Sequence, residues 1–219
     1  MRVLLSACYF WAATVLLKSF GARGFPVGDS SGDEEFSDVP CARASPVGRP
    51  PLHTSAYLAH WLWETAASWN ELLCKEQDMC KGSMEIVNQN NLHLPKITPN
   101  NGCYEPGFEK ETCLRNLSSG LYKFQTYLEY IEETSIDGAH GTTSIWPSTQ
   151  RLANNLRSMM NNPDTVTMPL PENQKAISAE LREQRHWNAT VTKHLILQGF
   201  ISFMEKTTRA IRHLCMANA

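Results

Sequence analysis

One apolar repeat constrains the fold of this chain more than any other feature. Between residues 109 and 134, apolar side chains follow one another at steps of three and four residues: Leu114, Leu117, Leu121, Phe124, Leu128 and Ile131. Such steps place side chains on one face of an α-helix, whereas a half-buried β-strand needs steps of two. The repeat therefore predicts a helix over 109–134 that packs in a bundle.

Other segments also have helical spacing, and none alternates apolar and polar residues over the length of a strand. One helix is predicted over 54–74, where Thr54 or Ser55 can cap the first turn. Another is predicted over 147–160, since Pro147 is tolerated in a first turn, and a short one over 174–185. The last long helix, over 187–214, has this apolar face: Ile196, Phe200, Phe203, Thr207, Ile211 and Leu214. The predicted fold class is all-α.

The lengths of the connections predict how the four long helices are arranged. A helix of about 25 residues is roughly 37 Å long, so a loop that returns along it needs at least about 11 extended residues. The connections over 75–108 and 161–186 are longer than that, and long loops are uncommon inside a compact domain. Two crossovers that run the length of the bundle explain them. We therefore expect an up-up-down-down four-helix bundle.

The first 24 residues resemble a secretory leader. Arg2 precedes a mostly apolar run over 3–17, and Ala22-Arg23-Gly24 fits a small-x-small cleavage site. The run is too short for a comfortable membrane span. Residues 25–52 are rich in Gly, Ser, Pro and acidic residues, which predicts a flexible tail. We expect a leader over 1–24, a tail over 25–52, a bundle over 53–219, and a secreted, extracellular protein.

Charge and motifs exclude several classes of function. The chain has 20 Lys and Arg against 22 Asp and Glu and no basic run, so neither nucleic acid nor an anionic membrane is expected as a partner. It contains no HExxH, GxSxG, phosphate-binding glycine loop or dinucleotide motif. Its seven histidines are scattered, and it has no CxxC spacing. We expect no enzyme, no catalytic residue, no cofactor and no metal.

The cysteine count suggests disulfides. Cys8 is in the leader, and six cysteines remain in the rest of the chain. An even number in an oxidising compartment favours bridges over free thiols. Two pairs would each close a short loop, but six cysteines allow 15 connectivities. Pairing between neighbours is thus a preference at this point, for Cys74 with Cys80 and Cys103 with Cys113.

Two cysteines lie outside those pairs. Cys41 precedes the first predicted helix by about a dozen residues, and Cys215 directly follows the last one. In an up-up-down-down bundle these two positions are at the same end, so a bridge between them is within reach of the chain. Two free thiols, or a bridge to another molecule, are the alternatives.

The chain contains two N-glycosylation sequons. Asn116-Leu117-Ser118 lies beside the apolar stripe of the helix over 109–134, and Asn188-Ala189-Thr190 lies at the start of the last helix. Both asparagines are candidate glycan sites, although such tripeptides also occur by chance.

Two segments resemble a known family. Residues 91–134 read NLHLPKITPNNGCYEPGFEKETCLRNLSSGLYKFQTYLEYIEET, and residues 187–214 read WNATVTKHLILQGFISFMEKTTRAIRHL. With the spacing of four cysteines, they are similar to the interleukin-6 family of long-chain four-helix cytokines, from about residue 74 to 214. The resemblance implies Cys74–Cys80 and Cys103–Cys113 bridges. It also implies a secreted cytokine that activates JAK/STAT signalling in immune and acute-phase responses.

The resemblance further implies two kinds of receptor partner, the interleukin-6 receptor α chain and a shared signal-transducing subunit. Tyr104 and Phe108 would form the α-receptor surface together with Arg209 and Arg212. Aromatic residues and arginine are common interface anchors. Spacing alone instead favours basic residues that complement the negative end of the last helix.

Two copies of the shared subunit would bind two other surfaces. The resemblance implies a first surface made of Trp61 and Thr65 with Ser148 and Arg151. Trp61, Thr65 and Arg151 differ from the residues usual in the family at these positions. Trp61 also has a core alternative, because it adjoins apolar residues of the first helix.

The second shared-subunit surface would centre on Trp187, with Val87 in the first long connection. A glycan on Asn188 would project beside Trp187. We therefore predict that Asn188 is unmodified or that its glycan points away from Trp187.

Two other functions compete with this interpretation. A receptor antagonist of the same fold would bind the α receptor without triggering signalling. A secreted helical carrier of small apolar ligands would need an open apolar pocket.

Overall fold

The computed structural model describes residues 50–77, 92–134, 144–183 and 186–217, without the side chains of 50, 51, 76, 77 and 186–188. All regular structure in these ranges is helical, which confirms the all-α prediction. The elements are α1 (Pro50–Gln77), the 3₁₀ turn η1 (Pro99–Asn101), α3 (Lys110–Thr134), α4 (Ile145–Ser158), the 3₁₀ turn η3 (Pro163–Thr165), α5 (Pro171–Arg182) and α6 (His186–Ala217).

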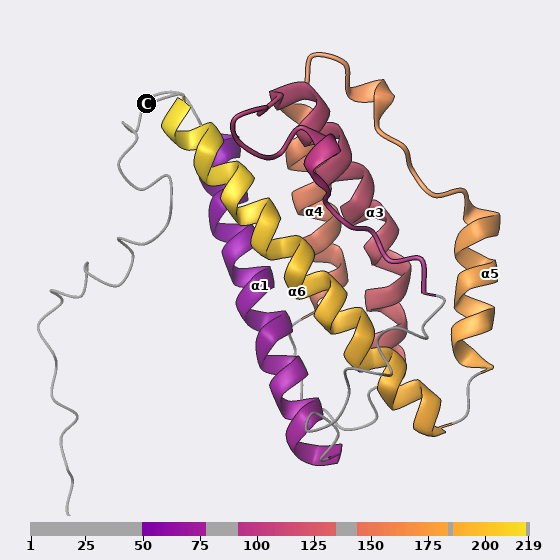
Figure 1. The fold of residues 1–219 in the computed structure, drawn as a ribbon. Helices are drawn as coiled ribbons and strands as arrows, with labels where there is room; N and C mark the ends of the chain where they lie inside the picture. Colours follow the sequence, from indigo (N-terminus) through magenta and orange to yellow (C-terminus); the bar gives the residue numbers. More distant parts are fainter. Residues whose placement is uncertain (1–49, 78–91, 135–143, 184–185, 218–219) are drawn as a thin grey trace, which may run out of the picture. The chain divides into compact units, whose positions relative to one another are not determined.

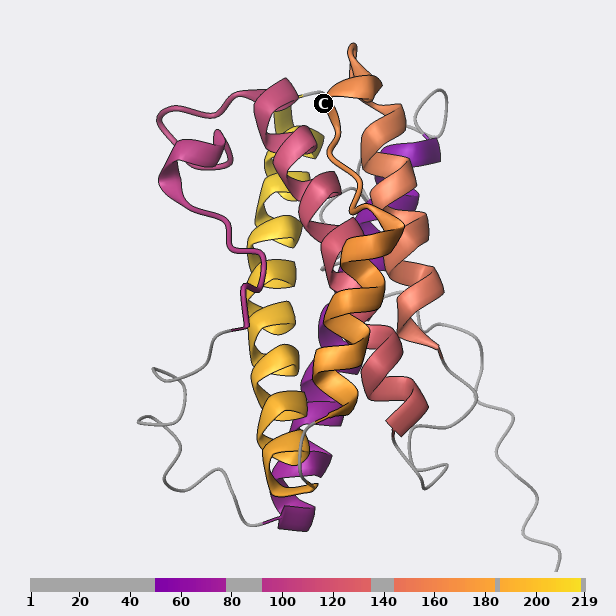
Figure 2. The same cartoon turned by 90° about the vertical axis from the view of Figure 1, so that its right-hand side faces the viewer.

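Four long helices form the bundle, and α5 packs against the outer side of α3 (Figures 1 and 2). Helices α1 and α3 run in one direction, and α4 and α6 run in the other. Contacts between helix ends agree, since Glu132 near the end of α3 bonds to Ser144 before α4. In the same way, Asn70 late in α1 bonds to His194 early in α6. This confirms the up-up-down-down arrangement.

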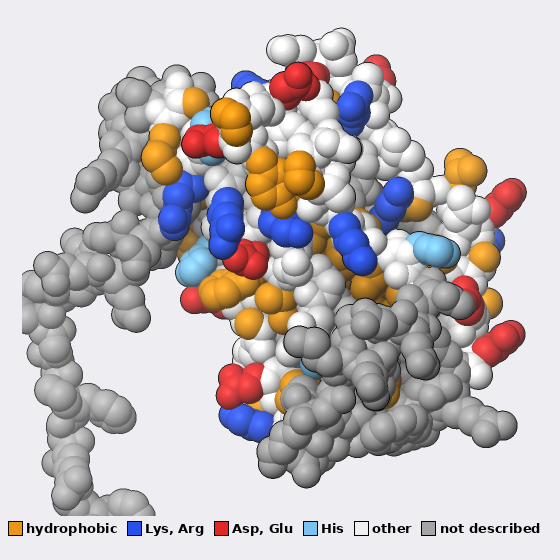
Figure 3. Space-filling model, viewed as in Figure 1, with side chains coloured by type: hydrophobic (Ala, Val, Ile, Leu, Met, Phe, Trp, Pro, Cys, Tyr) orange, Lys and Arg blue, Asp and Glu red, His pale blue; other side chains and the backbone are white. Residues whose placement is uncertain are grey.

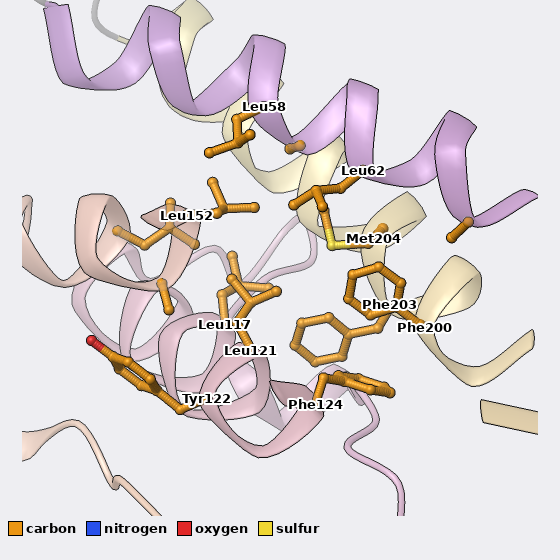
Figure 4. Close-up of a cluster of buried hydrophobic side chains, with 14 of the residues drawn as sticks. Leu58, Leu62, Leu117, Leu121, Tyr122, Phe124, Leu152, Phe200, Phe203 and Met204 are labelled. Atoms are coloured by element: carbon orange, nitrogen blue, oxygen red, sulfur yellow. The ribbon is translucent and has the colours of Figure 1, made fainter. Parts of the chain in front are cut away.

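The core consists of the apolar faces that the sequence predicted. All six apolar residues of the α3 repeat are buried, and so are all six of the predicted α6 face. At the centre, the ring of Phe124 meets the rings of Phe200 and Phe203 edge to face, with centroids 5.1 and 5.3 Å apart (Figure 4). Edge-to-face contacts of this kind add stability beyond the burial of area.

Gly120 brings α3 and α6 together at this cluster. A Cβ atom built on Gly120 would lie 2.4 Å from the ring of Phe203. No larger residue fits there unless the ring moves, so the absence of a side chain sets the distance between the two helices.

Four helices begin earlier than predicted: α1, α4, α5, which starts at Pro171 instead of residue 174, and α6, which starts at His186 instead of residue 187. Helix α1 starts at Pro50, inside the segment predicted as tail, and Ser55 is buried in its second turn and does not cap it. Prolines suit a first turn because its N–H groups have no partner within the helix. Helix α4 starts at Ile145, two residues before Pro147.

A carboxylate from the neighbouring helix caps α4. Glu132 Oε1 accepts hydrogen bonds from the backbone N–H groups of Ile145, at 2.6 Å, and Trp146, at 3.1 Å. A negative group at a helix N-terminus satisfies free N–H donors and opposes the helix dipole. This cap fixes the start of α4 against the end of α3.

Two long connections run along the bundle. Residues 92–109 climb beside α6 to the start of α3, and residues 159–170 lead from the end of α4 to α5 (Figures 1 and 2). Among the described residues, no helix is long and apolar enough to cross a membrane.

Candidate functional site

The connection before α3 is held in place by several local bonds. Cys103 and Cys113 form a disulfide, as predicted. Gly102 adopts a left-handed conformation, with φ at 69°, and its carbonyl accepts a hydrogen bond from Glu109 N–H at 2.8 Å. Asn101 Oδ1 accepts from the N–H and the hydroxyl of Thr98. The connection therefore meets α3 in a defined conformation.

Phe108 lies against the end of α6. Its ring centroid is 4.1 Å from that of His213. His213 Nδ1 donates to Glu105 Oε1, 2.6 Å away, in the same connection as Phe108. The aromatic ring and the carboxylate thus join the connection to the last turns of α6.

Tyr104 is partly buried beside this contact. Its hydroxyl donates to the carbonyl of Ile97 at 3.3 Å, and Lys206 Nζ of α6 donates to the same carbonyl at 3.2 Å. The Ile97 carbonyl therefore joins the Tyr104 hydroxyl to α6 through Lys206.

Arg209 and Arg212 are exposed on α6 and are three residues apart, hence on one helical face. Arg209 pairs with Glu205 one turn earlier. Figure 3 shows Lys and Arg side chains gathered in a row across α6 and the adjoining connection. Lys206 of α6 and the exposed Lys96 of the connection contribute further positive charge.

We call Tyr104, Phe108, Arg209 and Arg212 the α-receptor candidate surface. The structure brings the two aromatic residues to the end of α6 that carries the two arginines. Sequence reasoning missed Glu105 as a partner of His213. No local spacing could have revealed a contact between residues 108 positions apart.

The four residues of the first predicted shared-subunit surface lie on neighbouring helices. Leu58 of α1 and Leu152 of α4 point toward one another in the core (Figure 4). Trp61 follows Leu58 by about one turn and Ser148 precedes Leu152 by about one turn, so in antiparallel helices they reach the same level.

Trp61 and Thr65 are half-buried on α1. On α4, Ser148 is half-buried and Arg151 is exposed. Trp61 packs against the core without being enclosed by it, so its ring is partly accessible. We call these four residues the α1/α4 candidate surface.

The second predicted shared-subunit surface lies outside the described residues. Val87 falls in the undescribed range 78–91. Trp187 belongs to the first turn of α6, but its side chain is not described, nor is that of Asn188. Cys80 also lies outside the described residues. Its predicted partner Cys74 is described and is disulfide-bonded.

The predicted glycan site at Asn116 already has polar partners. Its side-chain amide donates to the carbonyl of Thr112 at 2.9 Å and to that of Asn101 at 3.2 Å. A glycan would replace one of these two N–H donors. Modification of Asn116 stays a prediction that competes with these contacts.

A pocket of about 300 Å³ lies between residues 92–97 and α6. Leu94, Ile97 and Phe203 contribute apolar walls, and Lys96 and Lys206 also line it. Its volume is at the lower limit of small-molecule sites. Among the described residues, no group of His, Cys, Asp or Glu could hold a metal ion.

Comparison with known proteins identifies the family. A model of the Interleukin-6/G-CSF/MGF family matches residues 30–214. This chain belongs to that family. The family is one of cytokines, and this confirms the prediction that the protein is not an enzyme.

Relatives within the Interleukin-6/G-CSF/MGF family agree over most of the chain. Interleukin-6 of Gallus gallus is 42% identical over 186 residues, which are 85% of this chain and 75% of that protein. Interleukin-6 of Phoca vitulina is 31% identical over 87% of this chain and 90% of that protein. A chain from the crystal structure of a cytokine/receptor complex superposes with a TM-score of 0.62 at 17% identity. The match covers 73% of this chain and 96% of that one, and it shows a shared fold.

Proposed function

We propose that the protein is a secreted cytokine that binds a dedicated receptor, of the interleukin-6 receptor α type, through the α-receptor candidate surface. The relatives named Interleukin-6 and the structural neighbour from a cytokine/receptor complex support receptor binding. The leader predicted over 1–24 supports secretion. The receptor-bound cytokine then recruits two copies of a shared signal-transducing subunit, which starts JAK/STAT signalling.

One observation carries this proposal: Phe108 lies, on a rigid support, against the end of α6 that carries Arg209 and Arg212. Phe108 is held by His213 on one side and by the disulfide-anchored connection on the other. A pre-ordered aromatic anchor loses little conformational entropy on binding. The arginines beside it are exposed and provide planar donors for acidic groups of a receptor.

The α1/α4 candidate surface supports recruitment of the shared subunit. Its residues lie on α1 and α4, whereas the α-receptor candidate surface lies on α6 and the connection before α3. Two surfaces built from different helices allow two receptor chains to bind one molecule together. Trp187 and Val87 would supply the third contact.

Signalling by the purified protein tests the proposal. Cells that display both receptor chains of the same species should respond with STAT phosphorylation. Phe108→Ala and Arg212→Ala should each weaken α-receptor binding by roughly 10–100-fold, which is typical for removal of an interface anchor. Surface plasmon resonance with the α receptor measures this directly.

Lys175→Ala provides a matched control, because Lys175 is an exposed cation on α5. It should leave binding unchanged, and circular dichroism should show full helicity for all three variants. Unchanged affinity in folded Phe108→Ala and Arg212→Ala proteins would show that the surface lies elsewhere.

The signalling assay and a dye-binding assay separate the two competing functions. An antagonist would bind the α receptor but give no STAT phosphorylation. A carrier would bind an apolar dye in the pocket between residues 92–97 and α6, and receptor chains would not compete with the dye.

A further inference from the structure

Cys215 takes part in a disulfide bond that the family resemblance does not provide. The residue lies in the last turns of α6, is only 5% exposed, and belongs to the same apolar cluster as Leu52 of α1. Cys103 and Cys113 are bonded to each other. The partner of Cys215 must therefore be one of the remaining cysteines.

The geometry of α1 and α6 excludes Cys74. His194 of α6 lies beside Cys74, with its Nδ1 atom 3.8 Å from the Cys74 sulfur. Cys215 is twenty-one positions further along α6, which is about 31 Å at roughly 1.5 Å per residue. A disulfide requires Cα atoms within about 7 Å.

The same distance excludes Cys80. It follows Cys74 by six residues, which span at most about 21 Å when fully extended. Part of that stretch is still helical, because α1 continues to Gln77. Cys80 therefore stays several ångströms short of Cys215 even in the most favourable path.

Cys41 is the cysteine that can reach. It precedes Pro50 by nine residues, or up to about 30 Å of extended chain. The start of α1 and the end of α6 lie at the same end of the bundle (Figure 1). Since Cys8 belongs to the predicted leader, we infer that Cys215 pairs with Cys41, as a third disulfide that ties the segment before α1 to the end of α6.

The bridge forms by thiol–disulfide exchange with a protein disulfide of the secretory compartment. One cysteine thiolate attacks the oxidant disulfide and gives a mixed disulfide, from which the second thiolate displaces the oxidant. The S–S bond of Cys41 and Cys215 forms, the oxidant leaves as a dithiol, and it takes up the two protons and two electrons. The inference depends on secretion in the proposed function but not on receptor binding.

The bridge has a consequence for the α-receptor candidate surface. Arg212 and His213 lie within one turn of Cys215. Helix ends fray unless something holds them, and a covalent bond at Cys215 keeps the last turn of α6 helical. The contact of Phe108 with His213 is preserved in this way.

A tryptic map of the unreduced, alkylated protein, secreted in full length from animal cells, tests the pairing. The C-terminal peptide over 213–219 contains Cys215, and the peptide that ends at Arg43 contains Cys41. We expect these two peptides as one linked species that separates on reduction. Three results would each overturn the inference: an alkylated 213–219 peptide without reduction, linkage of that peptide to residues 76–81, or a disulfide dimer on a non-reducing gel.

Thermal unfolding of variants gives a second measurement. Loss of a bridge that closes most of the chain should lower Tm by roughly 5–15 °C. Cys41→Ser should show this loss, and adding Cys41→Ser to Cys215→Ser should change Tm no further. An unchanged Tm in Cys41→Ser would contradict the bridge, whereas loss of STAT signalling in a protein with the linked peptide would contradict only the proposed function.

Discussion

His194 shows how a single side chain can make this bundle sensitive to acid. It is buried between α1 and α6, and its Nδ1 donates to Asn70 Oδ1 at 2.8 Å, because a carbonyl oxygen can only accept. Burial lowers the pKa of His194 below its ordinary value of 6.5. The folded protein therefore binds this proton less readily than the unfolded chain does.

Linkage gives the sign of the effect. Stability is complete above the pKa of the unfolded histidine and is lost as the pH falls below about 6.5 toward the folded pKa. We predict that His194→Asn, which keeps an N–H donor toward Asn70, flattens the dependence of the unfolding free energy on pH between 7 and 5. Urea titrations at several pH values measure this slope. The exposed His93→Asn should leave it as in the wild type, and an equal slope in both variants would refute the role of His194.

At the scale of helices, Gly120 determines how closely α3 approaches α6. We predict that Gly120→Ala lowers the free energy of unfolding by about 1–3 kcal/mol, the usual cost of overpacking. This cost exceeds the gain in helix propensity of up to about 1 kcal/mol. Chemical denaturation measures the difference.

Gly107→Ala is the matched control, because a Cβ atom there would have no atom within 4 Å. Its unfolding free energy should stay near that of the wild type. If Gly120→Ala proved equally neutral, the contact between the two helices would not depend on the missing side chain.

Glu111 joins the start of α3 to the chain beyond α4. Its two carboxylate oxygens accept hydrogen bonds from the backbone N–H groups of Asn161 and Asn162, at 3.0 and 2.8 Å. The bond from Asn162, and after it the bond from Asn161, lower the pKa of Glu111 below 4.5. The stabilisation is therefore present above about pH 4.5 and is lost as the pH falls through the folded pKa.

We predict that Glu111→Gln reduces the loss of stability between pH 5 and 3. A thermal melt series over that range tests it, with the exposed Glu129→Gln on the same helix as control. A steeper loss in Glu111→Gln than in the wild type would mean that the carboxylate is not what holds residues 161 and 162.

The sequence predicted helices better than it predicted their ends and contacts. The spacing of Leu114 through Ile131 identifies a buried face because periodicity is a local property. The cap of α4 by Glu132 and the contact of Phe108 with His213 join residues far apart in the chain, so no periodic pattern reports them. The early start of α1 was missed because two prolines were interpreted as part of a loop, although a first helical turn tolerates them.

Prediction of the candidate surfaces depended on the family resemblance more than prediction of the helices did. Spacing placed Arg209 and Arg212 on one face but could not tell a binding surface from a charged helix end. The structure adds the aromatic partner, since Phe108 comes from a connection whose path the sequence does not show.

At the scale of the whole molecule, receptor binding and signalling should be separable. We predict that Trp187→Ala and Arg151→Glu each keep α-receptor affinity but sharply reduce assembly of the complete receptor complex. Trp187 is twenty-two positions from Arg209, about 33 Å along α6, and Arg151 lies on another helix. Such variants should compete with the wild-type protein for the α receptor and so reduce its signalling.

Two assays distinguish the steps. Surface plasmon resonance with the α receptor should give wild-type affinity, while STAT phosphorylation should fall at the same dose. Full signalling by both folded variants would show that Trp187 and Arg151 do not belong to the shared-subunit surfaces. Weakened α-receptor binding would show that they contribute to the first binding step instead.

The shared location of the start of α1 and the end of α6 matters for anyone who attaches this protein to a sensor. An affinity tag placed after α6 would stand close to Arg212, so immobilisation through it would obstruct the α-receptor candidate surface. The end of α3 and the start of α4 lie at the opposite end of the bundle (Figure 1). A biotin-acceptor peptide inserted between them would hold the molecule with the α-receptor candidate surface toward solution.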